Sequence, residues 1–119
     1  MELLVNGHQT FCYTGGKPFN PAQPTVVLIH GVLNDHSVWA MQSRYLAHHG
    51  WNVLAVDLPG HCKSAGPAPT SVEEAADFIT ALLDAVGAPR AALVGHSWGS
   101  LIALEAAARL QERPEPPKR

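Results

Sequence analysis

The regular alternation of short apolar runs with amphipathic helical segments constrains this chain most. Residues 25–29, 51–56 and 91–94 are continuous, mostly apolar runs, as expected of strands that are covered on both faces. Between them, apolar residues recur at helical spacing over residues 37–49 and 72–86, and Gly50 and Gly87 supply the C-terminal stops. Strands that alternate with helices imply a mostly parallel sheet with right-handed crossovers, so the chain belongs to the α/β class.

Local signals refine this organisation. Residues 3–5 and 11–13 are two short strand candidates that flank Asn6-Gly7, a dipeptide typical of tight hairpin turns. Ser71 and Glu74 form a capping box at the start of the helix over 72–86, in which Glu74 reaches back. In the helix over 37–49, one face carries three larger apolar side chains, those of Val38, Met41 and Tyr45.

The last part of the chain divides into a helix and a tail. Residues 98–110 predict an apolar helix, which we expect to be buried. Residues 111–119 contain Pro114, Pro116 and Pro117 among charged side chains, so we expect a disordered tail. We therefore divide the chain into one domain unit over residues 1–110 and a proline-rich charged tail over residues 111–119.

Composition excludes several classes of partner. The chain has 119 residues, which is the size of one domain, and a net charge of -2, which gives no basic face for nucleic acid or for an anionic membrane. Cys12 and Cys62 form neither a disulfide framework nor a C-x-x-C pair, which favours a reducing cytoplasm. The first residues lack the pattern of a signal peptide, and no apolar stretch reaches the ~18 residues that span a bilayer. We expect a soluble, cytoplasmic protein.

Ser97 is the best nucleophile candidate. It lies in Gly95-His96-Ser97-Trp98-Gly99, which fits G-x-S-x-G, the sharp strand-to-helix turn called the nucleophile elbow. The competing interpretation is a serine in a helix-capping turn, and the apolar strand before it favours the elbow. Enzymes with this elbow take their triad in the order serine, then Asp or Glu, then histidine. No histidine or aspartate follows Ser97, and the later carboxylates are those of Glu105, Glu112 and Glu115.

Three segments, each after a predicted strand, carry a resemblance. They are His30-Gly31-Val32-Leu33, residues 57–64 with the sequence D-L-P-G-H-C-K-S, and the elbow over residues 95–99. In this order and context the chain resembles the N-terminal portion of an α/β-hydrolase-fold protein over residues 1–110. The resemblance implies a sheet in the order 1-2-4-3-5, with the C-terminal half of the fold absent. Cys62 stands where the family's loop usually has glycine, so a positive φ there would cost about 1 kcal/mol, unless the loop has shifted.

The resemblance also implies roles for individual residues. Ser97 would be the nucleophile, and the backbone amides of Val32 and Trp98 would form the oxyanion hole. The motifs would be supported by five further residues, namely His30, Gly31, Gly95, His96 and Gly99. His30 would brace its loop, and His96 should face the packing of the sheet because adjacent residues at a strand end point to opposite sides.

Two remaining sets of residues could be mistaken for catalytic or metal-binding residues. Asp57 resembles the family's loop aspartate, which fixes the turn by hydrogen bonds, rather than the acid of a triad. No set of His, Cys, Asp and Glu has metal-ligand spacing along the chain, and the adjacent His48 and His49 point apart. We therefore expect no metal site and no cofactor.

Two functions follow from these observations. The first is esterase-like acyl hydrolysis of a small apolar ester through Ser97, although the family also includes C–C bond hydrolases, peptidases and cofactor-free haloperoxidases. The second is a catalytically dead, truncated product, or an association partner that uses an exposed apolar sheet edge at residues 91–94. A frameshift, an early stop and a fragmentary gene model would all produce such a sequence. The absent downstream histidine favours the second function for the chain as written.

Overall fold

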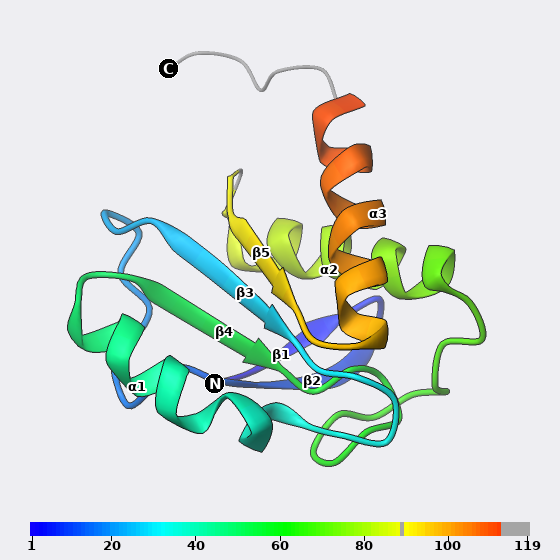
Figure 1. Cartoon of the computed structure of the whole chain (residues 1–119), viewed down its shortest axis with the longest axis horizontal. Helices are drawn as coiled ribbons and strands as arrows, with labels where there is room; N and C mark the ends of the chain where they lie inside the picture. The colour runs from blue at the N-terminus through cyan, green and yellow to red at the C-terminus, as the bar shows by residue number, and fades with distance from the viewer. Residues whose placement is uncertain (89, 113–119) are drawn as a thin grey trace.

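The computed structural model describes residues 1–88 and 90–112, which form one mixed five-stranded sheet with helices on both faces (Figure 1). The elements are β1 (Glu2–Val5), β2 (His8–Tyr13), β3 (Thr25–Ile29), the 3-10 helix η1 (His36–Trp39), α1 (Ala40–His48), β4 (Asn52–Val56), α2 (Val72–Val86), β5 (Ala92–Gly95) and α3 (Trp98–Glu112). The strand order β1-β2-β4-β3-β5 confirms the predicted order. Strand β3 pairs in parallel with β4 and β5, whereas β2 pairs antiparallel with β1 and β4.

The antiparallel edge begins with the predicted hairpin. Asn6 and Gly7 have φ values of 52° and 79°, which a two-residue turn of the primed type requires and which Asn and Gly adopt at low cost. The turn sets the register in which Val5 pairs with His8 and Glu2 pairs with Phe11. The Asn-Gly signal was therefore sufficient to place β1 against β2.

The parallel strands carry the core. Every residue of β3 and β4 is buried, as expected of strands with helices on both faces. Alternate side chains divide between two clusters: Val27 and Ile29 pack with α2 and α3, whereas Val26 and Leu28 pack on the opposite face with Ala47 of α1. Figure 1 shows this layering, with α2 and α3 side by side on one face of the sheet and α1 on the other.

Helix α2 has the bounds that its signals predict. The Ser71 hydroxyl accepts a hydrogen bond from the Glu74 amide at 3.1 Å, and Gly87, at φ 74°, ends the helix. The Glu74 carboxylate reaches back one residue further than Ser71, where it accepts hydrogen bonds from the amide and the hydroxyl of Thr70. The side chains of Ser71 and Glu74 thus both accept hydrogen bonds from backbone amides at the start of the helix.

Helix α1 packs differently from the pattern in its sequence. The face that carries Val38, Met41 and Tyr45 is exposed, with Met41 at 83%, and the buried side chains of α1 are those of Ser43 and Ala47. The cause is the loop before β3: a Cβ atom on Gly15 would lie 2.7 Å from Ala47 Cβ, so backbone and helix approach too closely for large side chains. Small residues therefore form this interface.

Helix α3 is buried on one side only, whereas the sequence predicted a buried helix. Ile102, Ala103 and Ala106 are buried, but Leu104 is 71% exposed and Leu101 is also exposed. The helix continues through Glu112, two residues beyond its predicted end, and the remainder of the predicted tail, residues 113–119, lies outside the described residues. No described helix is long and apolar enough to cross a bilayer.

Strand β5 lies at the edge of the sheet. It pairs with β3 alone, and its other side carries no strand in the described part of the chain. Val94 is 42% exposed and Ala92 is also exposed. The predicted open apolar edge is therefore present in this structure.

Candidate active site

Ser97 stands on the turn between β5 and α3, where the pattern of the sequence predicts the elbow. Its φ of 59° lies in the left-handed region, which costs a non-glycine residue about 1–3 kcal/mol and needs support from its surroundings. The support comes from backbone hydrogen bonds on both sides of Ser97: the His96 amide donates to the Ile29 carbonyl at 3.0 Å, and the Gly99 amide donates to the His96 carbonyl at 2.9 Å. The side chain of Ser97 is exposed at the carboxyl end of the strand.

Gly95 and Gly99 are required by close backbone contacts. A Cβ atom on Gly95 would overlap the Gly99 carbonyl, and a Cβ atom on Gly99 would overlap the Ile29 carbonyl and lie 2.7 Å from the His30 carbonyl oxygen. Backbone atoms cannot move aside as the end of a flexible side chain can. The turn is therefore packed tightly enough to hold Ser97 in its strained conformation.

The loop after β3 lies directly against this turn. A Cβ atom on Gly31 would lie 3.2 Å from Ser97 Cβ and 3.3 Å from the His96 carbonyl oxygen, so glycine allows the approach. Beyond Gly31, Leu33 has a φ of 63° and is 91% exposed. Among the described residues, no backbone or side-chain group accepts a hydrogen bond from the amide of Val32 or from that of Trp98.

His30 is a buried connection between two loops. Its Nε2 accepts a hydrogen bond from the Leu58 amide at 3.0 Å, so the proton lies on Nδ1, which donates to the Gly31 carbonyl at 2.7 Å. Burial lowers the pKa of His30, and it outweighs the hydrogen bond to Gly31, which raises that pKa. The ring is therefore neutral and holds the loops after β3 and β4 together.

Asp57 holds the same two loops together at a second point. This buried carboxylate accepts hydrogen bonds from the His36 amide at 2.7 Å, from His36 Nδ1 at 2.9 Å and from the Lys63 amide at 3.1 Å. The partnership with His36 was missed in the sequence, because a contact between distant positions leaves no local signal. In this loop Cys62 has a φ of 44°, so the position has the positive φ at which a residue other than glycine is strained.

His96 does not serve Ser97 as a base in this structure. Its exposed ring meets Trp39 edge-on, with 6.4 Å between ring centroids, on the face of the sheet that α1 covers. The Ser97 hydroxyl has no hydrogen-bond partner among residues 1–88 and 90–112. The described residues therefore provide an exposed serine hydroxyl and two amides without an acceptor, but no base in contact with the hydroxyl.

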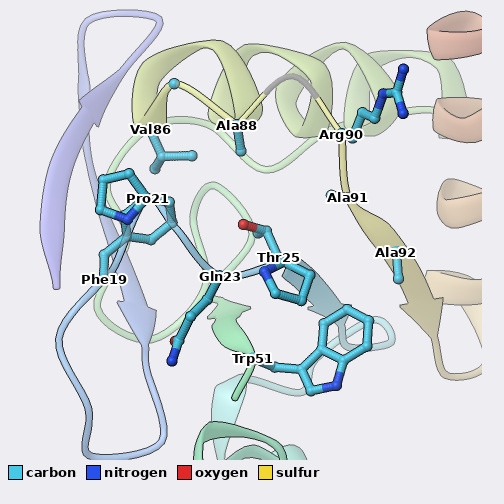
Figure 2. A pocket seen from close by; sticks show the side chains of 12 residues that line it. Phe19, Pro21, Gln23, Thr25, Trp51, Val86, Ala88, Arg90, Ala91 and Ala92 are labelled. Carbon is cyan, nitrogen blue, oxygen red and sulfur yellow. The ribbon is translucent and has the colours of Figure 1, made fainter.

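A cavity of about 690 Å³ lies elsewhere in the molecule (Figure 2). Its lining includes Thr25 and Ala92, the first residues of β3 and β5, together with Trp51 and Val86. Because β3 and β5 are parallel, this is the amino end of the strands, opposite to the end where Ser97 stands. The cavity is therefore not part of the Ser97 site.

Comparisons with known proteins agree with this fold. The family model described as alpha/beta hydrolase fold matches residues 24–116. Epoxide hydrolase A of Mycobacterium tuberculosis is 38% identical over 86 residues, which cover 69% of this chain and 26% of that protein. Lipase LipV of the same organism is 37% identical over 93 residues, which cover 76% of this chain and 34% of the lipase.

Solved structures show the same likeness. The crystal structure of a membrane phospholipase A, described as a bacterial virulence factor, superposes with a TM-score of 0.84 at 32% identity. The match covers 94% of this chain and 36% of the phospholipase. The chain thus spans about a quarter to a third of the length of the proteins that it matches.

Proposed function

The chain belongs to the α/β-hydrolase fold family, and we propose that it carries the nucleophile and the oxyanion hole of an esterase-like serine hydrolase. The observation that carries this proposal is the placement of Ser97, exposed on a strained strand-to-helix turn with a φ of 59°. Strain of this kind persists where the surroundings enforce it, and it is concentrated at functional sites. A serine that only capped α3 would not need the left-handed conformation.

The chemistry of a hydroxyl nucleophile favours acyl substrates over epoxides. Attack of Ser97 Oγ on an ester expels an alcohol and leaves an acyl-enzyme, whose carbonyl carbon water can attack to release the acid. Attack of the same oxygen on an epoxide would leave an ether, which has no carbonyl for water to attack, so the enzyme would not turn over. We therefore favour ester hydrolysis, the reaction class of the lipase among the relatives.

The amides of Val32 and Trp98 support the oxyanion role. Trp98 is the first residue of α3, so its amide has no acceptor within the helix, and Val32 follows Gly31, which touches the elbow. Donors of this kind stabilise the negative oxygen of a tetrahedral intermediate, and loss of one typically lowers kcat by about 10²–10³. The Val32 side chain takes no part in this role.

The proposed reaction needs a base that the described residues do not place beside Ser97. The hydroxyl of Ser97 has no partner among those residues, and the sequence contains no histidine after His96. An unassisted serine hydroxyl is almost wholly protonated near neutral pH and is a weak nucleophile. In this family's chain order, the acid and the histidine of the triad would follow the elbow.

One observation favours a second candidate function, that of a catalytically inactive association partner. The free side of β5 presents unpaired backbone groups beside the exposed Val94, and such an edge can pair with a strand of another chain. On this interpretation Ser97 is unreactive in every assembly. The experiments on Ser97 separate the two functions.

The test measures hydrolysis of p-nitrophenyl butyrate and labelling by a fluorophosphonate probe. We expect negligible activity from the 119-residue chain alone. We expect activity from a fusion in which this chain replaces the matching part of the lipase relative and is followed by the C-terminal part of that lipase. In the fusion, Ser97→Ala should abolish both signals, whereas Ser100→Ala, a matched change one helical turn later, should retain both. A folded fusion that resists the probe would refute the proposed function and favour the association partner.

A further inference from the structure

Four side chains with metal-binding atoms converge beside the loop that carries His30 and Gly31. Asp35, His36, Asp57 and Cys62 each offer one ligand atom, and these four atoms all lie within 4.8 Å of one another. Asp35 and His36 follow β3, whereas Asp57 and Cys62 follow β4, so the fold assembles the group from two separate segments. Spacing along the sequence gave no sign of it, because the two pairs lie in segments that are far apart in the chain, with 21 positions from His36 to Asp57.

The composition of this cluster distinguishes it from an ordinary patch of acidic residues. It combines one imidazole, one thiol and two carboxylates, and all three ligand types bind Zn²⁺ in proteins. Ca²⁺ and Mg²⁺ take oxygen ligands, so neither ion would use the thiol or the imidazole. Asp57 is fully buried, and its Oδ1 already lies 2.9 Å from His36 Nδ1, which fixes two of the four ligands relative to each other.

From this convergence we propose that Asp35, His36, Asp57 and Cys62 bind one Zn²⁺ ion in a tetrahedral site that joins the segments after β3 and β4. Zinc–ligand bonds of about 2.0–2.3 Å place tetrahedral ligands about 3.3–3.8 Å apart. The outermost atoms therefore move inward by about 1 Å, whereas His36 Nδ1 moves away from Asp57 Oδ1, which now lies 2.9 Å from it. Three of the four side chains are partly or fully exposed, which permits this movement.

Binding of the ion exchanges protons for metal bonds. The ion takes the place of the proton between His36 Nδ1 and Asp57 Oδ1. In a neutral ring this proton moves through solvent to Nε2, and in a protonated ring it leaves to solvent, so the bound imidazole carries one proton, on Nε2. The thiol of Cys62 releases its proton to solvent and binds as thiolate. Asp35 uses Oδ1 to cap the Ser37 amide at 2.8 Å and has its second carboxylate oxygen for the ion.

The experiment titrates the whole chain with Co²⁺, a spectroscopic substitute for Zn²⁺, in a buffer with a phosphine reductant that does not compete as a thiol. We expect one equivalent to give a near-ultraviolet thiolate-to-cobalt band, together with the strong visible bands of a four-coordinate ion. Zn²⁺ should then displace the Co²⁺, whereas Mg²⁺ and Ca²⁺ at the same concentration should not. The displacement curve gives the affinity for Zn²⁺.

Variants test each ligand against a matched control. Cys62→Ser should remove the thiolate band although Cys12 remains, and it should weaken Zn²⁺ binding at least about tenfold. His36→Gln and Asp35→Asn should weaken Zn²⁺ binding comparably, and Asp35→Asn keeps a side chain that can cap the Ser37 amide. His49→Gln and Glu73→Gln change one histidine and one carboxylate outside the cluster and should leave the affinity unchanged.

Two results would overturn the site. One is a titration in which no thiolate band develops. The other is a Zn²⁺ affinity that survives both Cys62→Ser and Asp35→Asn within a factor of two, which would mean that exposed histidines elsewhere bind the ion. Neither result bears on Ser97, so this inference and the proposed hydrolase function fail separately.

Discussion

Replacement of His30 by alanine should destabilise the fold more than any other single histidine substitution among the described residues. The ring has no exposed surface, and it connects the Leu58 amide to the Gly31 carbonyl. His30→Ala leaves both of these backbone groups without their partner, at about 1–3 kcal/mol for each buried group that stays unpaired. Because water can enter the space left by the ring, we expect a net loss of about 3 kcal/mol in the free energy of unfolding.

Urea denaturation followed by circular dichroism measures this loss. With a slope near 2 kcal/mol per molar urea, a loss of about 3 kcal/mol moves the midpoint down by about 1.5 M. His61→Ala is the control, since its half-buried ring lies 5.1 Å from the ring of His30 but makes its hydrogen bond within its own turn, to the carbonyl of Pro59. If the two variants lost equal stability, the connection between the loops would not be what makes His30 important.

His30 should also make the free energy of unfolding depend on pH. Burial lowers the pKa of His30, so the folded chain keeps this ring neutral at pH values where an unfolded chain, with a pKa near 6.5, binds a proton. The stabilising contribution is therefore present above about pH 6.5 and falls as the pH drops towards the lower pKa of the folded state. The difference in stability between the natural chain and His30→Ala should shrink on acidification, and an unchanged difference down to pH 5 would contradict the assignment.

Three further substitutions test the backbone. Gly99→Ala places a Cβ atom against the carbonyls of Ile29 and His30, and we expect a loss above about 3 kcal/mol or insoluble protein, as judged by thermal denaturation. Cys62→Gly relieves a φ of 44° and should raise metal-free stability by up to about 1 kcal/mol; a fall would show that the loop does not strain Cys62. Ser71→Ala removes the side chain that caps the Glu74 amide and should lower the free energy of unfolding, measured in urea, by about 1 kcal/mol. An unchanged free energy of unfolding would mean that water replaces the serine hydroxyl as the acceptor.

Much of the fold could be predicted because its signals are local. Asn6-Gly7 requires positive φ at both positions, and the continuous apolar runs of β3 and β4 require cover on both faces, which antiparallel edge strands do not. The turn at Ser97 is equally local, since flanking glycines and a strand before them leave few other conformations. The strand order came from the resemblance to the family, and the structure confirms it.

The features that escaped prediction all depend on contacts between distant segments. The apolar face of α1 gave no indication that Gly15 would bring the chain against Ala47, so that small rather than large residues are buried there. The contact of His36 with Asp57 forms only when the segments that follow β3 and β4 come together. The same is true of the cluster that these two residues form with Asp35 and Cys62. The spacing of residues along the chain cannot predict contacts between distant segments, and the expectation of no metal site rested on spacing alone.

The position of β5 in the sheet sets the order in which this site can form during folding. Ile29 pairs with Gly95, so the turn at Ser97 acquires its hydrogen bond to β3 only when the chain between these two residues, which contains α1, β4 and α2, has closed into a loop. Closing so long a loop is entropically slower than closing the β1–β2 hairpin, whose strands are joined by two residues. In pulse-labelled hydrogen exchange, the hairpin amides can gain protection early. The His96 amide, which donates to Ile29, should gain protection later than the hairpin amides, so Ser97 reaches its strained conformation after the hairpin has formed.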